Sequence, residues 1–115
     1  MAANLLSAKI TVNGKGGHSS VPFKCHDPIV TAAEIINIIT ARLAYEFDSF
    51  DNFRFEPVEF NAGQKSNIIP DTADITYEGV FETKDEMEKT RKIVTDTAEK
   101  IASVNAGTVD IAFGE

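Results

Sequence analysis

The sequence predicts an α+β fold, with a four-stranded antiparallel sheet that carries two helices on one face. Four segments alternate apolar and polar residues with the period of two that half-buried strands show. Two longer segments carry apolar residues at helical spacing. Their order is β-α-β-β-α-β, the ferredoxin-like βαββαβ arrangement, and right-handed crossovers leave few other topologies. Because this fold supports many activities, it does not by itself identify a function.

The first quarter of the chain predicts a strand, a loop and the start of a helix. Every second residue of 6–12 is apolar, which is typical of a strand. Residues 14–23 include three glycines and Pro22, so they are expected to form a loop. Asp27 then supplies a helix N-cap, and Pro28 is a proline at the first helical position.

The first helix is predicted from about Pro28 to about Tyr45. Its apolar residues form a wide stripe: Ile29, Ala32, Ala33, Ile35, Ile36, Ile38, Ile39 and Leu43. A stripe of this width can cover two surfaces, so we expect the helix to pack against the sheet and against something else.

The middle of the chain predicts two strands joined by a polar loop. Residues 53–62 alternate around Pro57, and the phase of the apolar residues shifts after it. Proline lacks the N–H that a sheet needs, so this segment is predicted to be an edge strand with a bulge. Residues 63–70 form the loop, and the alternation in 73–81 predicts the third strand.

A second helix and a last strand complete the predicted fold. Asp85 and Glu86 open the helix with their charges at its positive end, and Gly107 is expected to cap its C-terminus. Residues 109–113 alternate again and predict the last strand. No linker or repeat interrupts the chain, so residues 1–115 are predicted to form a single domain.

Composition argues against several classes of protein. The chain has 18 acidic and 11 basic residues and a net charge of −7, so nucleic-acid binding is not expected. No apolar run approaches ~18 residues, so no membrane span is expected. The N-terminus lacks a signal-peptide pattern, and a cytoplasmic location is the expectation. A single cysteine, Cys25, excludes an internal disulfide.

The glycine-rich loop contains the first candidate functional residue, His18. Gly14, Gly16 and Gly17 would allow positive φ angles and the close approach of a ligand. A histidine held there could donate a hydrogen bond to a developing oxyanion or move a proton. The alternative is a mobile surface histidine in a turn.

The polar loop contains the second candidate, Asn67. Its amide offers a donor and an acceptor to a substrate amide or carboxylate. The alternative is a turn residue that caps the local backbone. Other chemistry has little support, because Ser19 and Ser20 lack the third member of a catalytic triad and Lys15 lies outside Walker spacing. Two histidines and one cysteine are too few for a convincing metal site.

Several motifs in order resemble one family. The segments GKGGHSSVP at 14–22, DPI at 27–29 and NIIPD at 67–71, with Gly63, are similar to the lid or dimerisation domain of the co-catalytic zinc aminoacylase/carboxypeptidase family, the M20-type amidohydrolases. The resemblance covers essentially the whole chain. Members include aminoacylases, succinyl-diaminopimelate desuccinylases, dipeptidases and auxin-conjugate amidohydrolases.

The resemblance implies a role within a larger enzyme. This domain would be inserted into a catalytic domain in which two zinc ions activate the water that hydrolyses N-acyl amino acids or small peptides. It would form a homodimer through an edge strand and the first helix. His18 would stabilise the oxyanion in the active site of the partner subunit, and Asn67 and Gly17 would contact substrate. The metal ligands would lie outside this chain, which would be inactive alone.

One position departs from the family pattern. Many members carry an arginine in a Gly-x-x-Arg-Thr pattern that can bind a substrate carboxylate, whereas here the pattern runs from Gly79 to Thr83 with Glu82 in the arginine position. A carboxylate held from this position is therefore not expected.

Two other hypotheses fit the predicted fold. One is a free-standing ferredoxin-like module that binds a small ligand at its dimer interface. The other is a small acylphosphatase-like enzyme, which would need an arginine in a phosphate-binding loop. Arg42, Arg54 and Arg91 all fall on predicted helices or a strand, which disfavours the enzyme.

Overall fold

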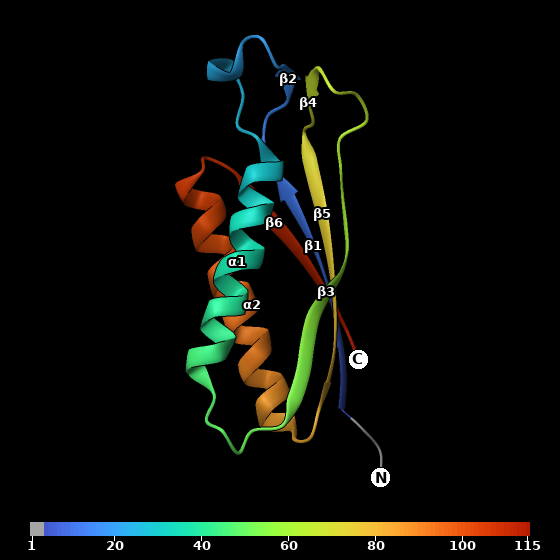
Figure 1. Ribbon diagram of the computed structural model, residues 1–115, viewed down its shortest axis with the longest axis vertical. Coiled ribbons are helices and arrows are strands. Elements are labelled where there is room, and N and C mark those ends of the chain that lie inside the picture. The colour runs from blue at the N-terminus through green and yellow to red at the C-terminus, as the bar shows by residue number, and fades with distance from the viewer. Residues whose placement is uncertain (1–3) are drawn as a thin grey trace.

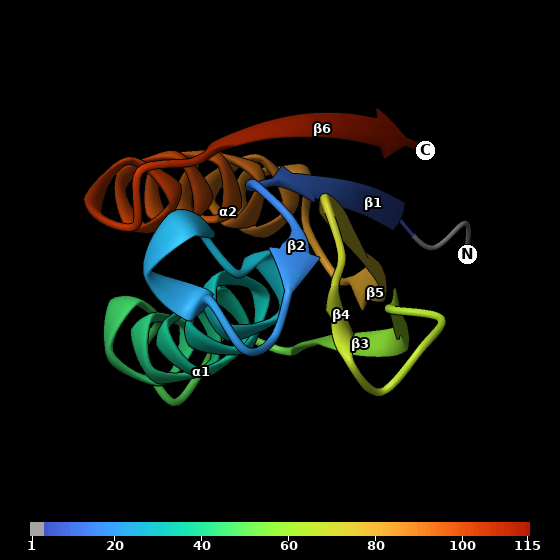
Figure 2. The ribbon, with the colours of Figure 1, turned by 90° about the horizontal axis from the view of Figure 1, so that it is seen from above.

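The computed structural model describes residues 4–115 and confirms the α+β sandwich. Its main sheet has the order β3-β5-β1-β6, with antiparallel pairing between all neighbours. The strands are β1 (Asn4–Asn13), β3 (Phe53–Ala62), β5 (Thr72–Phe81) and β6 (Thr108–Gly114). Helices α1 (Pro28–Glu46) and α2 (Lys84–Val104) both cover one face of this sheet (Figure 2).

Two short strands lie beyond the end of the main sheet, where the sequence predicted loops. Strand β2 (Gly17–His18) pairs with β4 (Ile68–Ile69) in a separate two-stranded ribbon (Figure 1). A short 3-10 helix, η1 (Pro22–Lys24), follows β2. Two-residue strands are too short to show any periodicity, which is why the sequence did not predict them.

The core lies between the helices and the inward face of the sheet. On β1 and β5 the apolar residues alternate into the core as the sequence predicted, and α1 and α2 cover them with their own apolar sides. The fully buried residues of this cluster are Ala8, Ile10, Val12, Ala32, Ile35, Ile39, Ala73, Ile75, Tyr77, Val94 and Ala98. This packing fixes the strand register, because a slip by one residue would turn the whole apolar set to solvent.

The helix ends agree with the sequence at one helix and differ at the other. Asp27 caps α1 by accepting the Ile29 N–H at 2.9 Å, as predicted. Helix α2 begins at Lys84, one residue before the predicted acids, because Thr83 is its N-cap and forms a reciprocal capping box with Glu86.

At the C-terminal end of α2, Gly107 does not have the left-handed cap conformation predicted for it. The left-handed residue is Ala106, with a φ of 59°. The N–H groups of Ala106 and Gly107 donate to carbonyls of the last helical turn at 3.1 and 2.8 Å, the pattern of a Schellman motif. Gly107 is required for another reason, since a Cβ there would lie 2.5 Å from the Asn13 carbonyl oxygen.

Strand β3 is an edge strand, as Pro57 predicted, and its register with β5 shifts between Pro57 and Glu59. Helix α1 lies on the side of the sandwich that contains β3, while α2 lies on the side of β6 (Figure 2). Val58 and Phe60 remain exposed on β3, so this edge and the neighbouring helix offer a joint apolar surface.

Helix α1 is, by length and composition alone, apolar enough to cross a membrane, with a mean hydropathy of 1.2 over an 18-residue window. The lack of a long uninterrupted apolar run predicted no such segment, whereas this window also includes threonine and asparagine. Its inner side belongs to the core, with Ile35 and Ile39 fully buried. On the side away from these residues, five uncharged residues at helical spacing form what we call the outer stripe, and the exposed Glu34 lies beside it: Val30, Ala33, Asn37, Ala41 and Ala44.

The molecule is long and narrow, with extents of 53 × 22 × 18 Å. Ser7, in the first half of β1, pairs with Gly114, the last residue of β6. The start and the end of the described chain therefore lie near one end of the main sheet, and the β2–β4 ribbon lies at the other (Figure 1).

Candidate functional site

The β2–β4 ribbon brings the two candidate residues together from distant parts of the sequence. His18 lies opposite Ile68 in the ribbon, and Gly17 lies opposite Ile69. Just beyond the paired residues, the Ser19 N–H donates to the Asn67 carbonyl oxygen at 3.0 Å. His18 and Asn67 thus lie at the same end of one small ribbon.

The glycines before His18 are needed for close packing rather than for positive φ angles. Among the described glycines only Gly63 has a positive φ, of 82°, so the expected left-handed backbone at 14, 16 and 17 is wrong. A Cβ on Gly14 would lie 2.2 Å from the His26 carbonyl oxygen, and one on Gly16 would lie 2.3 Å from that of Ile69. No side chain fits at either position.

Gly17 was predicted to contact substrate because a glycine permits close approach. In the structure the space beside its Cα is taken by Cys25, since a Cβ on Gly17 would lie 2.9 Å from the cysteine Sγ. The side of Gly17 that lacks a side chain therefore packs against the protein itself. A substrate contact at Gly17 stays a prediction.

Asp71 fixes the ribbon against the end of β1, a role that the sequence analysis did not identify. Its carboxylate Oδ1 accepts the Gly16 N–H at 2.9 Å, and its backbone carbonyl accepts the Gly14 N–H at 2.8 Å. Asp71 is the last residue of the NIIPD motif, but a motif alone does not show which groups its aspartate contacts.

The imidazole of His18 is exposed and held in one orientation by Ser20. The Ser20 backbone N–H donates to His18 Nδ1 at 3.1 Å, and the Ser20 Oγ lies 2.7 Å from the same nitrogen. Because a backbone N–H can only donate, Nδ1 must accept. In the neutral ring the proton therefore lies on Nε2, which is left as a hydrogen-bond donor. A catalytic role for His18 stays a prediction.

Asn67 lies in the turn that leads into β4. The turn is closed by the backbone, because the Ile68 N–H donates to the Lys65 carbonyl oxygen at 3.2 Å. Asn67 is exposed, and among residues 4–115 no hydrogen bond engages its side-chain amide. The amide is therefore not the local backbone cap that the alternative hypothesis described.

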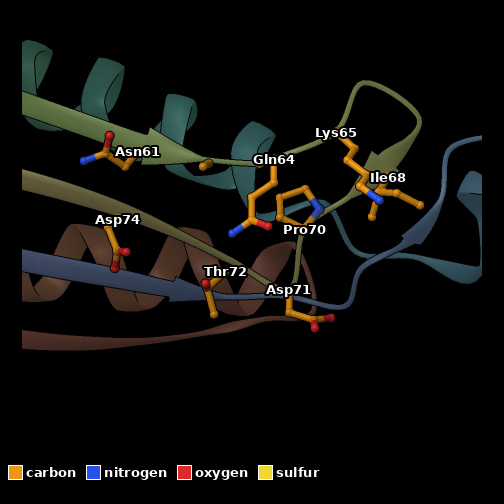
Figure 3. A pocket seen from close by; sticks show the side chains of 10 residues that line it. Asn61, Gln64, Lys65, Ile68, Pro70, Asp71, Thr72 and Asp74 are labelled. Atoms are coloured by element: carbon orange, nitrogen blue, oxygen red, sulfur yellow. The ribbon is translucent and has the colours of Figure 1, made fainter.

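Two hollows flank the loop that carries Asn67. One, of about 490 Å³, lies where β3 and β5 separate, and Figure 3 shows Gln64 pointing into it above Thr72. The other, of about 440 Å³, lies between this loop, Ser19 and the start of α1. His18, Asn67 and Gly17 line neither hollow, whereas Ile68 of β4 lines both, so the hollows lie on the β4 side of the ribbon.

The residue in the family arginine position lies far from the ribbon. Strand β5 begins at Thr72 beside β4 and ends at Phe81 at the opposite end of the sheet (Figure 1). Glu82 follows Phe81 there, and its N–H donates to the Asn52 carbonyl oxygen at 3.2 Å. Ten strand residues span about 33 Å, so position 82 cannot contact a ligand at His18 of the same subunit.

The described residues contain no cluster that could hold a metal ion. Within 4–115 no group of three or more histidine, cysteine, aspartate or glutamate side chains comes together in this way. The zinc ions that the resemblance implies therefore do not fit this part of the protein.

Comparisons with known proteins agree with the sequence motifs. A family model described as the peptidase dimerisation domain matches residues 2–106. The chain is 32% identical over 109 residues to thermostable carboxypeptidase 2 of Saccharolobus solfataricus, covering 93% of this chain and 27% of that protein. It is 31% identical to IAA-amino acid hydrolase ILR1-like 4 of Arabidopsis thaliana, covering 93% of this chain and 24% of that protein.

Solved structures share the fold. The chain superposes on a tripeptidase from Staphylococcus aureus with a TM-score of 0.83 at 20% identity, covering 97% of this chain and 29% of that one. It superposes on aminopeptidase PepT from Bacillus cereus with a TM-score of 0.80 at 21% identity, covering 97% and 29%. The chain spans about a quarter of the length of the curated relatives that it matches.

Proposed function

Because this chain belongs to the peptidase dimerisation domain family, we propose that it is the dimerisation and lid domain of a dizinc amidohydrolase or peptidase. The family members that resemble it are hydrolases, among them a carboxypeptidase and an amino acid conjugate hydrolase. The observation that carries the proposal is the imidazole of His18, held by Ser20 with Nε2 as a free donor. The substrate would be an N-acyl amino acid or a small peptide.

His18 acts as a donor to the oxygen of the scissile amide. When an amide carbonyl is attacked, negative charge develops on its oxygen, and a donor already aimed at that oxygen stabilises the transition state. Ser20 keeps Nδ1 occupied as an acceptor, so Nε2–H faces outward without any change of tautomer. The exposed amide of Asn67, in the turn that leads into the neighbouring strand, binds and orients the substrate beside it.

The zinc ions belong to the catalytic domain of the parent enzyme, which lies outside this chain. The described residues offer no metal-binding cluster, so this domain would contribute hydrogen bonds and subunit assembly. When bound in the parent, the metal ions would supply the activated water. This chain would then have no hydrolase activity on its own.

The shape of the domain supports delivery of His18 to the partner subunit. Any residues that precede β1 or follow β6 would leave the domain near one end of the sheet. His18 lies at the other end of a molecule 53 Å long. A catalytic domain joined at the first end is remote from its own His18. In a dimer, the ribbon of one subunit can instead reach the active site of the other.

The dimer would form through α1 and the β3 edge. The outer stripe of α1 has no charged residue, and β3 lies beside it with unpaired backbone groups along its outer side. Two copies related by a two-fold axis would pair their β3 edges and pack their α1 helices, which removes both exposed surfaces from water. Pro57 and the bulge would limit this pairing to part of the strand.

The first test is His18→Ala in the full-length enzyme. We expect kcat to fall by roughly 100- to 1,000-fold with little change in KM, because the lost hydrogen bond forms mainly in the transition state. His26→Ala is the matched control, since His26 is also exposed and its backbone pairs with Lys15 of the glycine-rich loop. An unchanged kcat in His18→Ala would remove the catalytic role from this residue.

A mixed dimer tests whether His18 acts across the subunit interface. One subunit carries His18→Ala with an intact catalytic domain, and the other keeps His18 but has its metal ligands removed. If His18 acts in the partner, the first catalytic domain receives an intact histidine and the mixture regains activity. If the mixture stays as inactive as its two parents, His18 acts within its own subunit.

A further inference from the structure

We propose that the side-chain hydroxyl of Ser20 is a positioning group for His18 and strengthens the Nε2–H donor of its imidazole. This role rests on the proposed function, in which His18 donates to the oxygen of the scissile amide, and deepens it. The proposed function needs only the backbone N–H of Ser20, which any residue except proline would supply at this position. The hydroxyl is a second contribution, and it depends on which side chain stands at position 20.

A tight turn holds the Ser20 side chain beside the imidazole. The Val21 N–H donates to the His18 carbonyl oxygen at 3.1 Å, which closes a β-turn with Ser19 and Ser20 at its centre. The Ser19 N–H donates to the Asn67 carbonyl oxygen at 3.0 Å and so joins this turn to the ribbon. Two backbone hydrogen bonds therefore fix the position of the hydroxyl relative to the ring.

The hydroxyl donates its proton to the ring. Its Oγ lies 2.7 Å from His18 Nδ1, which is an ordinary length for a good hydrogen bond. The Ser20 backbone N–H donates to the same nitrogen at 3.1 Å, so Nδ1 of the neutral ring carries a lone pair and no proton. Since Nδ1 has no proton to give, the Ser20 Oγ–H must be the donor in this contact.

A donor at Nδ1 makes the Nε2–H of the same imidazole a stronger donor. It draws electron density through the ring, and hydrogen bonds that are linked in a chain polarise one another. The Ser20 hydroxyl, the His18 ring and the substrate oxygen would form such a chain. Its effect is greatest when the substrate oxygen carries negative charge, so it lowers the barrier more than it tightens substrate binding.

The contact is specific to Ser20 and His18. Within residues 4–115 the Ser20 hydroxyl has no other hydrogen-bond partner. His26 is also exposed, but in this part of the chain no group forms a hydrogen bond with its ring. Ser19 is the other hydroxyl of the turn, and it lines the hollow beside α1 without bonding to either described imidazole. An exposed hydroxyl in this loop is therefore not enough to give the contact.

The test uses the full-length enzyme and begins with Ser20→Ala. This substitution removes the hydroxyl but keeps the backbone N–H, and Ser20 is exposed, so the fold should be unaffected. We expect kcat to fall by about 3- to 10-fold with KM nearly unchanged, because one neutral hydrogen bond that acts mainly in the transition state is lost. Ser20→Thr keeps a hydroxyl on the same carbon and should retain most of kcat.

Ser19→Ala is the matched control, because it removes the neighbouring exposed hydroxyl, which does not contact the imidazole. It should leave kcat unchanged. A double variant then shows whether Ser20 acts through His18. In the His18→Ala background the hydroxyl has no ring to polarise, so adding Ser20→Ala should not lower kcat further.

Three results would overturn this role for Ser20. The first is full kcat in Ser20→Ala, and the second is an equal loss in Ser19→Ala or Ser20→Thr. The third is a loss on adding Ser20→Ala to His18→Ala that is as large as in the unsubstituted enzyme, since this would show that Ser20 acts without the imidazole. The proposed function fails by a different result, an unchanged kcat in His18→Ala, so the two failures are distinguishable.

Discussion

At the scale of single residues, the structure stores backbone strain at Ala106. This residue has a φ of 59°, and among residues 4–115 it alone has a positive φ without being glycine. An L-residue in this region is less stable than glycine by about 1 kcal/mol, because its Cβ approaches the following carbonyl. Ala106→Gly should therefore raise the free energy of unfolding by up to about 1 kcal/mol in urea titrations.

Ala102→Gly is the comparison for this prediction. Ala102 lies in the last turns of α2 and is fully buried, so glycine there loses both packing and helix propensity. It should lower stability while Ala106→Gly raises it. A loss of stability in both variants would show that the side chain of Ala106 contributes more than its backbone costs.

At the scale of secondary-structure elements, Glu86 joins the start of α2 to the loop before β3. Its carboxylate accepts N–H groups of Thr83 at 3.0 Å and Asn52 at 2.9 Å. Burial by itself would raise the pKa of Glu86, but these backbone donors outweigh it and hold the pKa below its usual value. The contacts therefore stabilise the fold only while Glu86 is ionised.

This arrangement predicts a pH dependence of stability with a definite sign. Since the folded-state pKa is lowered, the stabilisation is fully present above the ordinary value of 4.5 and is lost as pH falls through the folded-state pKa. Glu86→Gln should lower stability at neutral pH and flatten the decrease below that value. Urea unfolding at several pH values measures both effects. Glu99→Gln, at an exposed position of the same helix, should keep the wild-type pH profile.

At the scale of the whole molecule, the outer stripe of α1 is predicted to hold two copies together. Val30 lies on this stripe and is 55% exposed. Val30→Glu would place a charge in the helix contact, where desolvation is costly, and should convert the dimer to a monomer in sedimentation equilibrium. Val104→Glu is the control, because Val104 is 84% exposed at the end of the other helix. An equal loss of dimer in both variants would contradict an interface at α1.

The oligomeric state bears on function as well as on assembly. If His18 acts in the partner subunit, then Val30→Glu should abolish activity in the full-length enzyme without touching any residue near the ribbon. Activity that survives complete dissociation would separate dimerisation from catalysis. The oligomeric state and the activity of Val30→Glu together decide whether His18 acts in the active site of the partner subunit.

Local patterns in the sequence were sufficient to predict the elements and their order. The alternation in β1, β5 and β6, the two helical stripes and the cap at Asp27 are local patterns, and each element formed where its pattern predicted. Pro57 also predicted that its strand lies at a sheet edge, because proline lacks the N–H that a strand in the interior of a sheet must donate. The motifs around His18 and Asn67 predicted the family, which the comparisons confirmed.

The construction of the candidate site, by contrast, depends on contacts between distant segments that local patterns do not predict. The β2–β4 pairing joins segments that are far apart in the chain, and two residues in each are too few for a periodic signal. The crowding at Gly14 and Gly16, the acceptor role of His18 Nδ1 and the remoteness of Glu82 all depend on which atoms the fold brings within contact. Local backbone preferences act over a few residues, whereas these contacts join residues that are distant in the sequence and meet only in the folded chain.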